Sequence, residues 1–171
     1  GKTLVSAILC EAWGYDYWKP VQCGLTRDAE TVLALVSNPD TTIHPETWLL
    51  NTPASPHAAA KIDGVEIALG NFKLPTNRPL IVEGAGGCLV PLNDHDLIVD
   101  LMLHLKARVI LVSDLYLGSI NHTLLSAEAL KHRNIPVAGI IFNGPSNLMS
   151  ESAILRHTGL PCLLRIDKES N

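Results

Sequence analysis

Hydrophobic positions recur along the chain at two spacings, one typical of helices and one typical of strands. Near the N-terminus, Leu4, Ile8, Leu9 and Ala12 follow the helical spacing and predict an amphipathic helix. The same criterion predicts helices over residues 3–13, 27–36, 57–62, 94–105, 120–132 and 149–157. Ser55 followed by Pro56 is typical of an N-cap and a first helical position, and places the start of the third of these helices.

Short continuous apolar runs lie between the helices and predict strands. The clearest run is 107–112, whose β-branched residues are typical of a strand buried on both faces. Strands are also predicted at 15–21, 79–83, 135–142 and 162–166, whereas 39–56 is predicted to be an irregular surface segment. Strands that alternate with helices indicate an α/β fold with a mostly parallel sheet and helices on both faces. Neither a repeat nor a linker interrupts the pattern, so we expect a single domain over 1–171.

The composition narrows the class of protein. Hydrophobic residues make up 47% of the chain and charged residues 18%, which excludes a disordered protein. The formal net charge is −4 and there is no basic block, which argues against a nucleic-acid partner. No apolar run reaches the roughly 18 residues of a membrane span, so we expect no membrane partner. The four cysteines form no C-x-x-C pair, which predicts reduced thiols and a cytoplasmic location.

Polar and glycine residues follow each predicted strand. Ligands of parallel α/β sheets bind beyond the carboxyl ends of the strands. These ends are therefore expected to form one binding edge. The segments concerned are 19–24, 83–87, 113–121 and 143–145.

The chain opens with Gly1-Lys2-Thr3, which matches the last three positions of the phosphate loop G-x-x-x-x-G-K-[ST]. In that loop, backbone N–H groups cradle phosphates, the lysine reaches the terminal phosphates and the threonine binds Mg²⁺. A chance tripeptide is the alternative. If the loop is real, its other positions and its strand belong upstream of Gly1, and the chain begins inside its own phosphate loop.

Three charged residues near the predicted strand ends are candidates for this chemistry. Glu83 precedes a glycine-rich turn and could hold Mg²⁺ beside phosphates, while Gly86 in that turn lets the backbone approach a ligand. The alternative for Glu83 is a solvated turn residue. Lys19 follows an apolar, aromatic strand and needs a partner, for which an anion is suited. Asp28 begins a predicted helix, where the helix dipole alone could favour it.

The segment 117–122 begins another predicted helix. Free N–H groups at the start of this helix would favour a carboxylate or a phosphate, and an ordinary cap by Ser119 is the alternative. Cys23 lies in a candidate loop, but no base is paired with it, which argues against a nucleophile.

Taken together, these motifs resemble dethiobiotin synthetase, the ATP-dependent enzyme family of biotin biosynthesis. They occur in the family's order and span nearly the whole chain. The matching segments are Gly1-Lys2-Thr3, 17–21 with Gly24, Asp28, 54–57, 82–87 with 90–92, 117–122 and Asn143. The resemblance implies a P-loop NTPase-like, three-layer fold.

The resemblance also implies the reaction and the role of each residue. A vicinal diamine, 7,8-diaminononanoate, takes up CO₂ as a carbamate, ATP phosphorylates the carbamate, and ring closure gives dethiobiotin. The implied catalytic residues are Lys2 and Lys19, and Thr3, Asp28 and Glu83 are implied to bind Mg²⁺. ATP is implied to contact Gly1, Lys2, Thr3, Glu83, Gly86 and Asn143, with Asn143 on adenine. The substrate is implied to contact Lys19, Cys23, Gly86, Gly118, Ser119, Ile120 and Asn121, within a homodimer that binds it at the subunit interface.

The sequence departs from the family in three places. Cys23 stands where members often carry Ser or Thr, and a thiol is a weaker hydrogen-bond donor. The upstream half of the phosphate loop is missing, and the chain stops at 166–171, before the family's last helix. A catalytically silent fragment is one alternative. Another is a P-loop nucleotide switch or partitioning-type ATPase that acts through protein partners, although such a protein would not need Lys19-Pro20 or residues 117–121.

Overall fold

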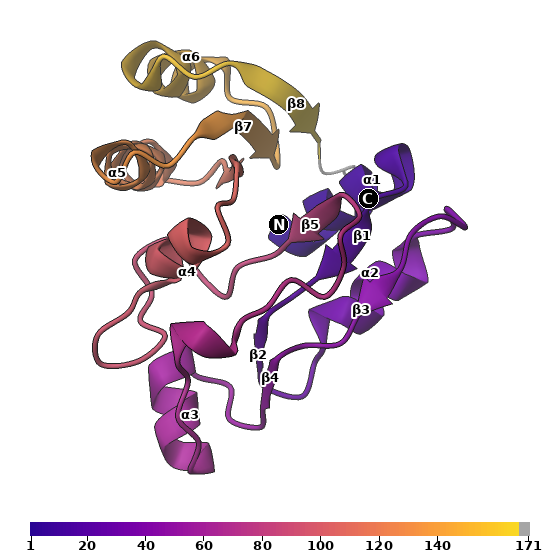
Figure 1. Cartoon of the computed structure of the whole chain (residues 1–171). Helices are drawn as coiled ribbons and strands as arrows, with labels where there is room; N and C mark the ends of the chain where they lie inside the picture. Colours follow the sequence, from indigo (N-terminus) through magenta and orange to yellow (C-terminus); the bar gives the residue numbers. More distant parts are fainter. Residues whose placement is uncertain (168–171) are drawn as a thin grey trace. The chain divides into compact units, whose positions relative to one another are not determined.

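The computed structural model describes residues 1–167. The sequence predicts that the chain stops at 166–171, before the family's last helix, and residues 168–171 of that stretch lie outside the described residues. The fold is α/β, and its paired strands are parallel, as expected (Figure 1). Two compact units make up the chain: Lys2–Leu105, the N-terminal unit, and Lys106–Asn171 together with Gly1, the C-terminal unit. Across the described residues, every helix is too short or too polar to cross a bilayer.

The N-terminal unit contains two parallel sheets, with strand orders β3-β1-β5 and β2-β4. The register pairs Tyr17 of β1 with Ile81 of β5 and Trp18 with Val82. Its elements are α1 (Lys2–Trp13), β1 (Asp16–Trp18), β2 (Val21–Cys23), α2 (Asp28–Leu35), β3 (Ile43–His44), β4 (Trp48–Leu50), α3 (Pro56–Asp63), the 3₁₀ helix η1 (Leu69–Asn71), β5 (Leu80–Val82) and α4 (Ile98–His104).

Two buried apolar clusters lie on opposite faces of β1. Tyr17 packs with residues of α1 and α2, whereas the next residue, Trp18, packs with residues of α3 and α4. Successive side chains of a strand point to opposite faces, so helices cover both faces of the sheet in this unit. The layered arrangement predicted from the alternating pattern is present here.

The C-terminal unit is built on a three-stranded parallel sheet of order β6-β7-β8. Its helices α5 and α6 pack against each other, as Figure 1 shows in orange and yellow. Asn143, the last residue of β7, pairs in register with Asp114 of β6 and Ile166 of β8. The elements are β6 (Val109–Asp114), α5 (Ser119–His132), β7 (Val137–Asn143), α6 (Leu148–Thr158) and β8 (Cys162–Ile166).

Two strand predictions need correction. The strand predicted at 15–21 is divided into β1 and β2, because the chain leaves the sheet at Lys19 and Pro20, and proline has no N–H to donate. The segment 39–56, predicted to be irregular, contains β3 and β4, which pair with β1 and β2. Strands of two or three residues are too short to produce a recognisable alternation.

The helix predicted at 94–105 begins later, at Ile98. The side-chain oxygen of Asn93 accepts hydrogen bonds from the backbone N–H groups of His95 and Asp96 at 2.8 and 2.7 Å. This local bonding competes with helix formation, and Leu97 forms an isolated antiparallel bridge with Pro91 before the helix begins. By contrast, α3 begins as predicted, with Ser55 as its N-cap and Pro56 as its first residue.

Candidate nucleotide and metal site

Four of the predicted site residues meet in the N-terminal unit. Thr3 lies in the first turn of α1, Asp28 begins α2, and Lys19 and Glu83 follow the neighbouring strands β1 and β5. Those strands are parallel, and the backbone N–H of Glu83 donates to the carbonyl of Trp18 at 3.0 Å. The carboxyl ends of both strands therefore meet at one edge, as the sequence predicts.

The four side chains contact one another directly. The Thr3 hydroxyl lies 3.1 Å from Oδ1 of Asp28 and 3.0 Å from Oε1 of Glu83. The Lys19 ammonium donates to Oδ2 of Asp28 and lies 3.4 Å from Oε1 of Glu83. Lys19 and Glu83 are only 6% and 4% exposed. The predicted anionic partner of Lys19 is thus a pair of carboxylates, and Glu83 is not a solvated turn residue.

The cluster fits a hard cation. The Thr3 hydroxyl has one proton, yet it lies within hydrogen-bond distance of two carboxylate oxygens, so only one of these contacts can be a hydrogen bond from Thr3. The two carboxylates carry two negative charges, and the single ammonium of Lys19 balances only one of them. Magnesium prefers one or two carboxylates together with phosphates and water. The residues present therefore suit Mg²⁺, and within 1–167 no larger group of His, Cys, Asp and Glu gathers around a metal position.

Tyr17 belongs to this site, although the sequence pattern gave it no role. Its hydroxyl donates to Oε2 of Glu83 at 2.9 Å, and its side chain is fully buried. Burial first, and the Glu83 carboxylate second, raise the pKa of Tyr17, which keeps the phenol a neutral donor. A buried phenol usually has a hydrogen-bond partner. The position of Tyr17 on a buried strand, two residues before Lys19, is the sequence feature that could have indicated a contact at the site.

Gln22 is a second residue that the sequence pattern did not single out. Its side-chain Nε2 lies 3.2, 3.5 and 2.9 Å from the carbonyl oxygens of Cys23, Gly24 and Thr26, and these three acceptors share its two N–H groups. Its oxygen accepts from the backbone N–H of Asp28 at 3.3 Å. Gln22 is 4% exposed, so these bonds fix the loop that presents Asp28.

A cavity of about 350 Å³ adjoins the cluster within the same unit. Gly86 lines it with φ +73°, and a Cβ there would lie 2.8 Å from Cγ2 of Val90, so this position requires glycine. Burial raises the pKa of the Cys23 thiol, and the nearby Lys19 opposes the shift only in part. The lining residues are Lys19, Gln22, Cys23, Asp28, Ala54, Ser55, Pro56, Ala85, Gly86 and Val90.

The remaining predicted residues are Gly1, Lys2, Gly118, Ser119, Ile120, Asn121 and Asn143, and each belongs to one of the two units. Lys2 is exposed and begins α1 beside Thr3, whereas Gly1 is grouped with the C-terminal unit. Gly118 is the N-cap of α5 with φ +101° and no side-chain cap. The alternative that Ser119 caps the helix is wrong, because Ser119 is its first residue and is buried. Ile120 and Asn121 continue the first turn.

Asn143 ends β7 and is 2% exposed. Its side-chain oxygen is buried and has no hydrogen-bond partner in the described part of the chain. A buried acceptor without a partner is costly. A ligand N–H group, such as the amine of a nucleotide base, would satisfy it.

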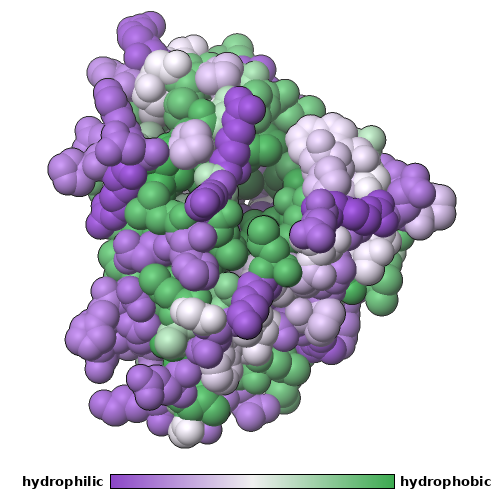
Figure 2. Space-filling view, in the orientation of Figure 1, coloured by the Kyte–Doolittle hydropathy of each residue, from purple (hydrophilic) through white to green (hydrophobic). Residues whose placement is uncertain are grey.

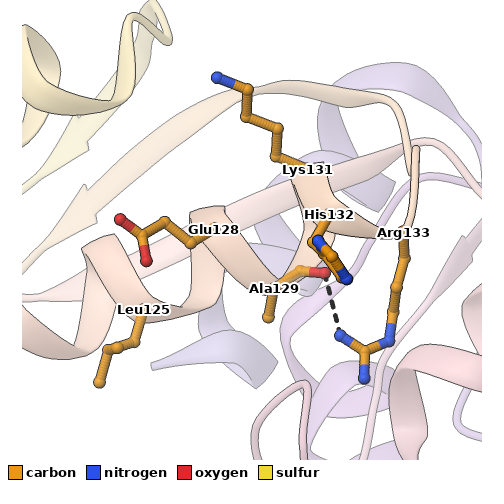
Figure 3. Close-up of a pocket in the computed structure, with 6 residues that line it drawn as sticks. All are labelled: Leu125, Glu128, Ala129, Lys131, His132 and Arg133. Carbon is orange, nitrogen blue, oxygen red and sulfur yellow. Dashed lines mark hydrogen bonds between the residues drawn. The ribbon is translucent and has the colours of Figure 1, made fainter.

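A second, more open depression of about 600 Å³ lies along α5 (Figure 3). Arg133 folds back there and donates to the backbone carbonyl of Ala129 at 3.3 Å, the dashed line in the figure. The lining residues are Leu125, Glu128, Ala129, Lys131, His132 and Arg133. Figure 2 shows hydrophobic residues scattered among hydrophilic ones on the face that it draws. None of the predicted site residues lines the depression, and we assign it no ligand.

A parallel α/β fold in which Gly-Lys-Thr opens the first helix and its threonine contacts two carboxylates is that of a nucleotide-binding protein of the P-loop class. A family model described as an AAA domain matches residues 1–171.

The chain is 58% identical over 172 residues to the ATP-dependent dethiobiotin synthetase BioD of Cytophaga hutchinsonii, covering 99% of this chain and 84% of the relative. It is 50% identical over 172 residues to the protein of the same name from Christiangramia forsetii, covering 99% and 83%. For the one from Brucella ovis, the identity is 51% over 157 residues, covering 90% and 74%. The chain therefore belongs to the ATP-dependent dethiobiotin synthetase family.

Proposed function

We propose that this protein is an ATP-dependent cyclo-ligase that carboxylates 7,8-diaminononanoate with CO₂ and closes the ring to dethiobiotin. The observation that carries the proposal is the cluster of Thr3, Lys19, Asp28 and Glu83, in which Lys19 and Glu83 are buried. It lies in a chain that shares 58% identity with a named dethiobiotin synthetase.

The reaction has three bond-forming steps. One amine of the diamine attacks CO₂ and gives a carbamate. A carbamate oxygen attacks the γ-phosphorus of ATP and releases ADP. The second amine then attacks the carbonyl carbon, so that a C–N bond forms, the C–O bond to phosphate breaks, and the cyclic urea and inorganic phosphate leave. The phosphoryl transfer places one anion beside another, and cations are needed to lower that barrier.

Lys19 is suited to stabilise the carbamate. Its ammonium is buried at the wall of the cavity, where screening by water is weak, and Asp28 and Glu83 hold it in place. Lys2 begins α1, and we propose that it holds the transferring phosphoryl group. Cys23 and Gly86 line the same cavity and are proposed to contact the substrate.

Thr3, Asp28 and Glu83 are proposed to hold Mg²⁺. When bound, the ion would neutralise charge on the phosphates of ATP. Gly1 and Gly86 are proposed to add backbone contacts to ATP.

The C-terminal unit supplies the other proposed contacts. Asn143 is suited to adenine because its buried oxygen has no partner among the described residues. Gly118, Ser119, Ile120 and Asn121 are proposed to bind the substrate's distant carboxylate at the N-terminus of α5, which has no side-chain cap. We further propose a cytoplasmic homodimer with the substrate at the subunit interface. Leu117, which is fully exposed beside Gly118, favours a partner at that position.

A nucleotide switch that acts through protein partners has no comparable support. Such a protein needs a phosphate loop and Mg²⁺, but it has no use for a buried lysine at a substrate cavity. Its relatives would also bear names other than dethiobiotin synthetase.

Isotope labelling tests the proposed product. The purified enzyme is given the diamine, MgATP and ¹³C-bicarbonate, and the products are analysed by mass spectrometry. We expect dethiobiotin that carries one ¹³C at its ureido carbon. A product without the label, or no cyclic urea while ATP is consumed, would overturn the proposal. Omission of the diamine is the control.

A further inference from the structure

The proposed mechanism assigns no role to Tyr17. Its ring lies in the buried apolar cluster with Ala7 and Cys10 of α1 and Ala29 and Val32 of α2. Only its hydroxyl is polar, and that hydroxyl donates to Oε2 of Glu83 at 2.9 Å. A phenylalanine would fill the same apolar space, so packing does not explain the hydroxyl.

The register of the sheet explains how the contact arises. Tyr17 pairs with Ile81, and Glu83, two residues further along, extends from the same face of the sheet. The ring is held by the cluster on one side and the strand on the other, and its hydroxyl therefore has a fixed position. This places a rigid donor beside a carboxylate at the carboxyl end of β5.

The two oxygens of Glu83 have different partners. Oε1 lies 3.0 Å from the Thr3 hydroxyl and 3.4 Å from the Lys19 ammonium. Oε2 has the Tyr17 hydroxyl. A hydrogen bond on one oxygen restrains rotation of the carboxylate and directs the other oxygen toward Thr3 and Lys19.

We propose that Tyr17 is a positioning residue for metal binding, which restrains Glu83 through Oε2 and reserves Oε1 for Mg²⁺. This inference rests on the proposed role of Glu83 as a metal ligand. Hydrogen bonds to metal ligands from residues behind them commonly change metal affinity by about 10- to 100-fold. Without the hydroxyl, the Glu83 carboxylate can rotate. It then loses this rotational freedom when Mg²⁺ binds, which lowers the affinity for the ion.

The test is Mg²⁺ binding to Tyr17→Phe, measured by calorimetric titration in the presence of saturating ADP. Because this readout does not depend on turnover, it separates metal binding from catalysis. We expect the apparent Kd for Mg²⁺ to rise about 10-fold. The KM for Mg²⁺ in the full reaction should rise in parallel, with kcat recovering at saturating Mg²⁺.

Tyr15→Phe is the matched control, because Tyr15 is half-buried and its ring contacts Trp13 rather than the cluster. It should bind Mg²⁺ as the wild type does, and circular dichroism should show that both variants are folded. An unchanged Kd in Tyr17→Phe would overturn the inference.

Glu83→Gln distinguishes failure of the inference from failure of the proposed site. If Glu83→Gln weakens Mg²⁺ binding and Tyr17→Phe does not, Tyr17 has no positioning role but Glu83 remains a ligand. If neither variant changes binding, the metal assignment itself is wrong. In the double variant, removal of the Tyr17 hydroxyl should add nothing to the effect of Glu83→Gln.

Discussion

At the scale of single residues, the central feature is a buried lysine between two carboxylates. Lys19 is 6% exposed and contacts both Asp28 and Glu83. Removing one member of a buried ion pair leaves the others uncompensated, at a cost of about 3–5 kcal/mol. An apolar set of similar volume is often equally stable, so a gain in stability does not by itself account for these buried charges.

Substitution of Lys19 by alanine should abolish turnover and spare much of the ATP binding, because the proposed contact of Lys19 is with the carbamate. We expect a fall in kcat of at least about 100-fold, the usual loss when one stabilising donor is removed. Steady-state kinetics and calorimetric ATP binding measure the two effects. Lys61→Ala, at an exposed site in the last turn of α3, is the control. Unchanged turnover in Lys19→Ala would contradict the assignment.

Cys23 should react slowly with alkylating reagents. Burial raises the pKa of its thiol, so at any given pH less of the reactive thiolate is present than for an ordinary cysteine. Iodoacetamide labelling, followed by mass spectrometry of the Cys23 peptide, should be slower than labelling of glutathione at mildly alkaline pH. It should accelerate as the pH rises. A rate equal to that of glutathione would show that the thiol is neither buried nor perturbed.

Tyr17 and Gln22 show why residue-scale prediction from sequence was incomplete. The motifs located Thr3, Lys19 and Glu83, because each occupies a recognisable position beside glycines or at a strand end. Tyr17 looked like any aromatic residue of a buried strand. Its contact with Glu83 depends on the pairing of β1 with β5, which the sequence pattern does not reveal.

At the scale of elements, long segments were predictable and short ones were not. The 3.6-residue period placed α1, α2, α5 and α6 within a residue or two of their observed bounds. β3 and β4 were missed because two or three residues carry no period. The sequence pattern does not show the division between β1 and β2, because Lys19 and Pro20 lie inside an apolar run. The early part of 94–105 is not helical, because the Asn93 side chain bonds to the backbone there.

The C-terminal unit offers an element-scale prediction at the contact between α6 and β8. Glu151 is 1% exposed and accepts from the Ser146 hydroxyl at 3.3 Å, the Asn147 N–H at 3.2 Å and the Arg165 guanidinium. Arg165→Met leaves the Glu151 charge buried without its cation and should lower the free energy of unfolding by more than Glu151→Gln does. Glu151→Gln leaves a partly exposed arginine that water can solvate, and should cost about 1–2 kcal/mol.

Urea unfolding measures both variants. Arg156→Met is the control, since Arg156 is exposed on the same helix, and it should leave the midpoint unchanged. If Arg165→Met were as stable as the wild type, the ion pair would not stabilise the contact between α6 and β8.

At the scale of the whole molecule, candidate residues lie at the carboxyl ends of parallel strands in both units. Parallel strands end at one edge of their sheet, and the residues at those ends differ between the units. β1 and β5 are followed by Lys19 and Glu83, a charged pair suited to phosphates and Mg²⁺. β7 ends in Asn143, a neutral amide suited to a base.

The central claim is that ATP cleavage is coupled to the diamine. The most direct test measures ADP release by the purified enzyme with bicarbonate present, with and without 7,8-diaminononanoate, together with the dethiobiotin formed. We expect ADP release to require the diamine and one ADP to accompany each dethiobiotin. ADP release at the same rate without the diamine would contradict the claim, and would point to a nucleotide switch instead of a ligase.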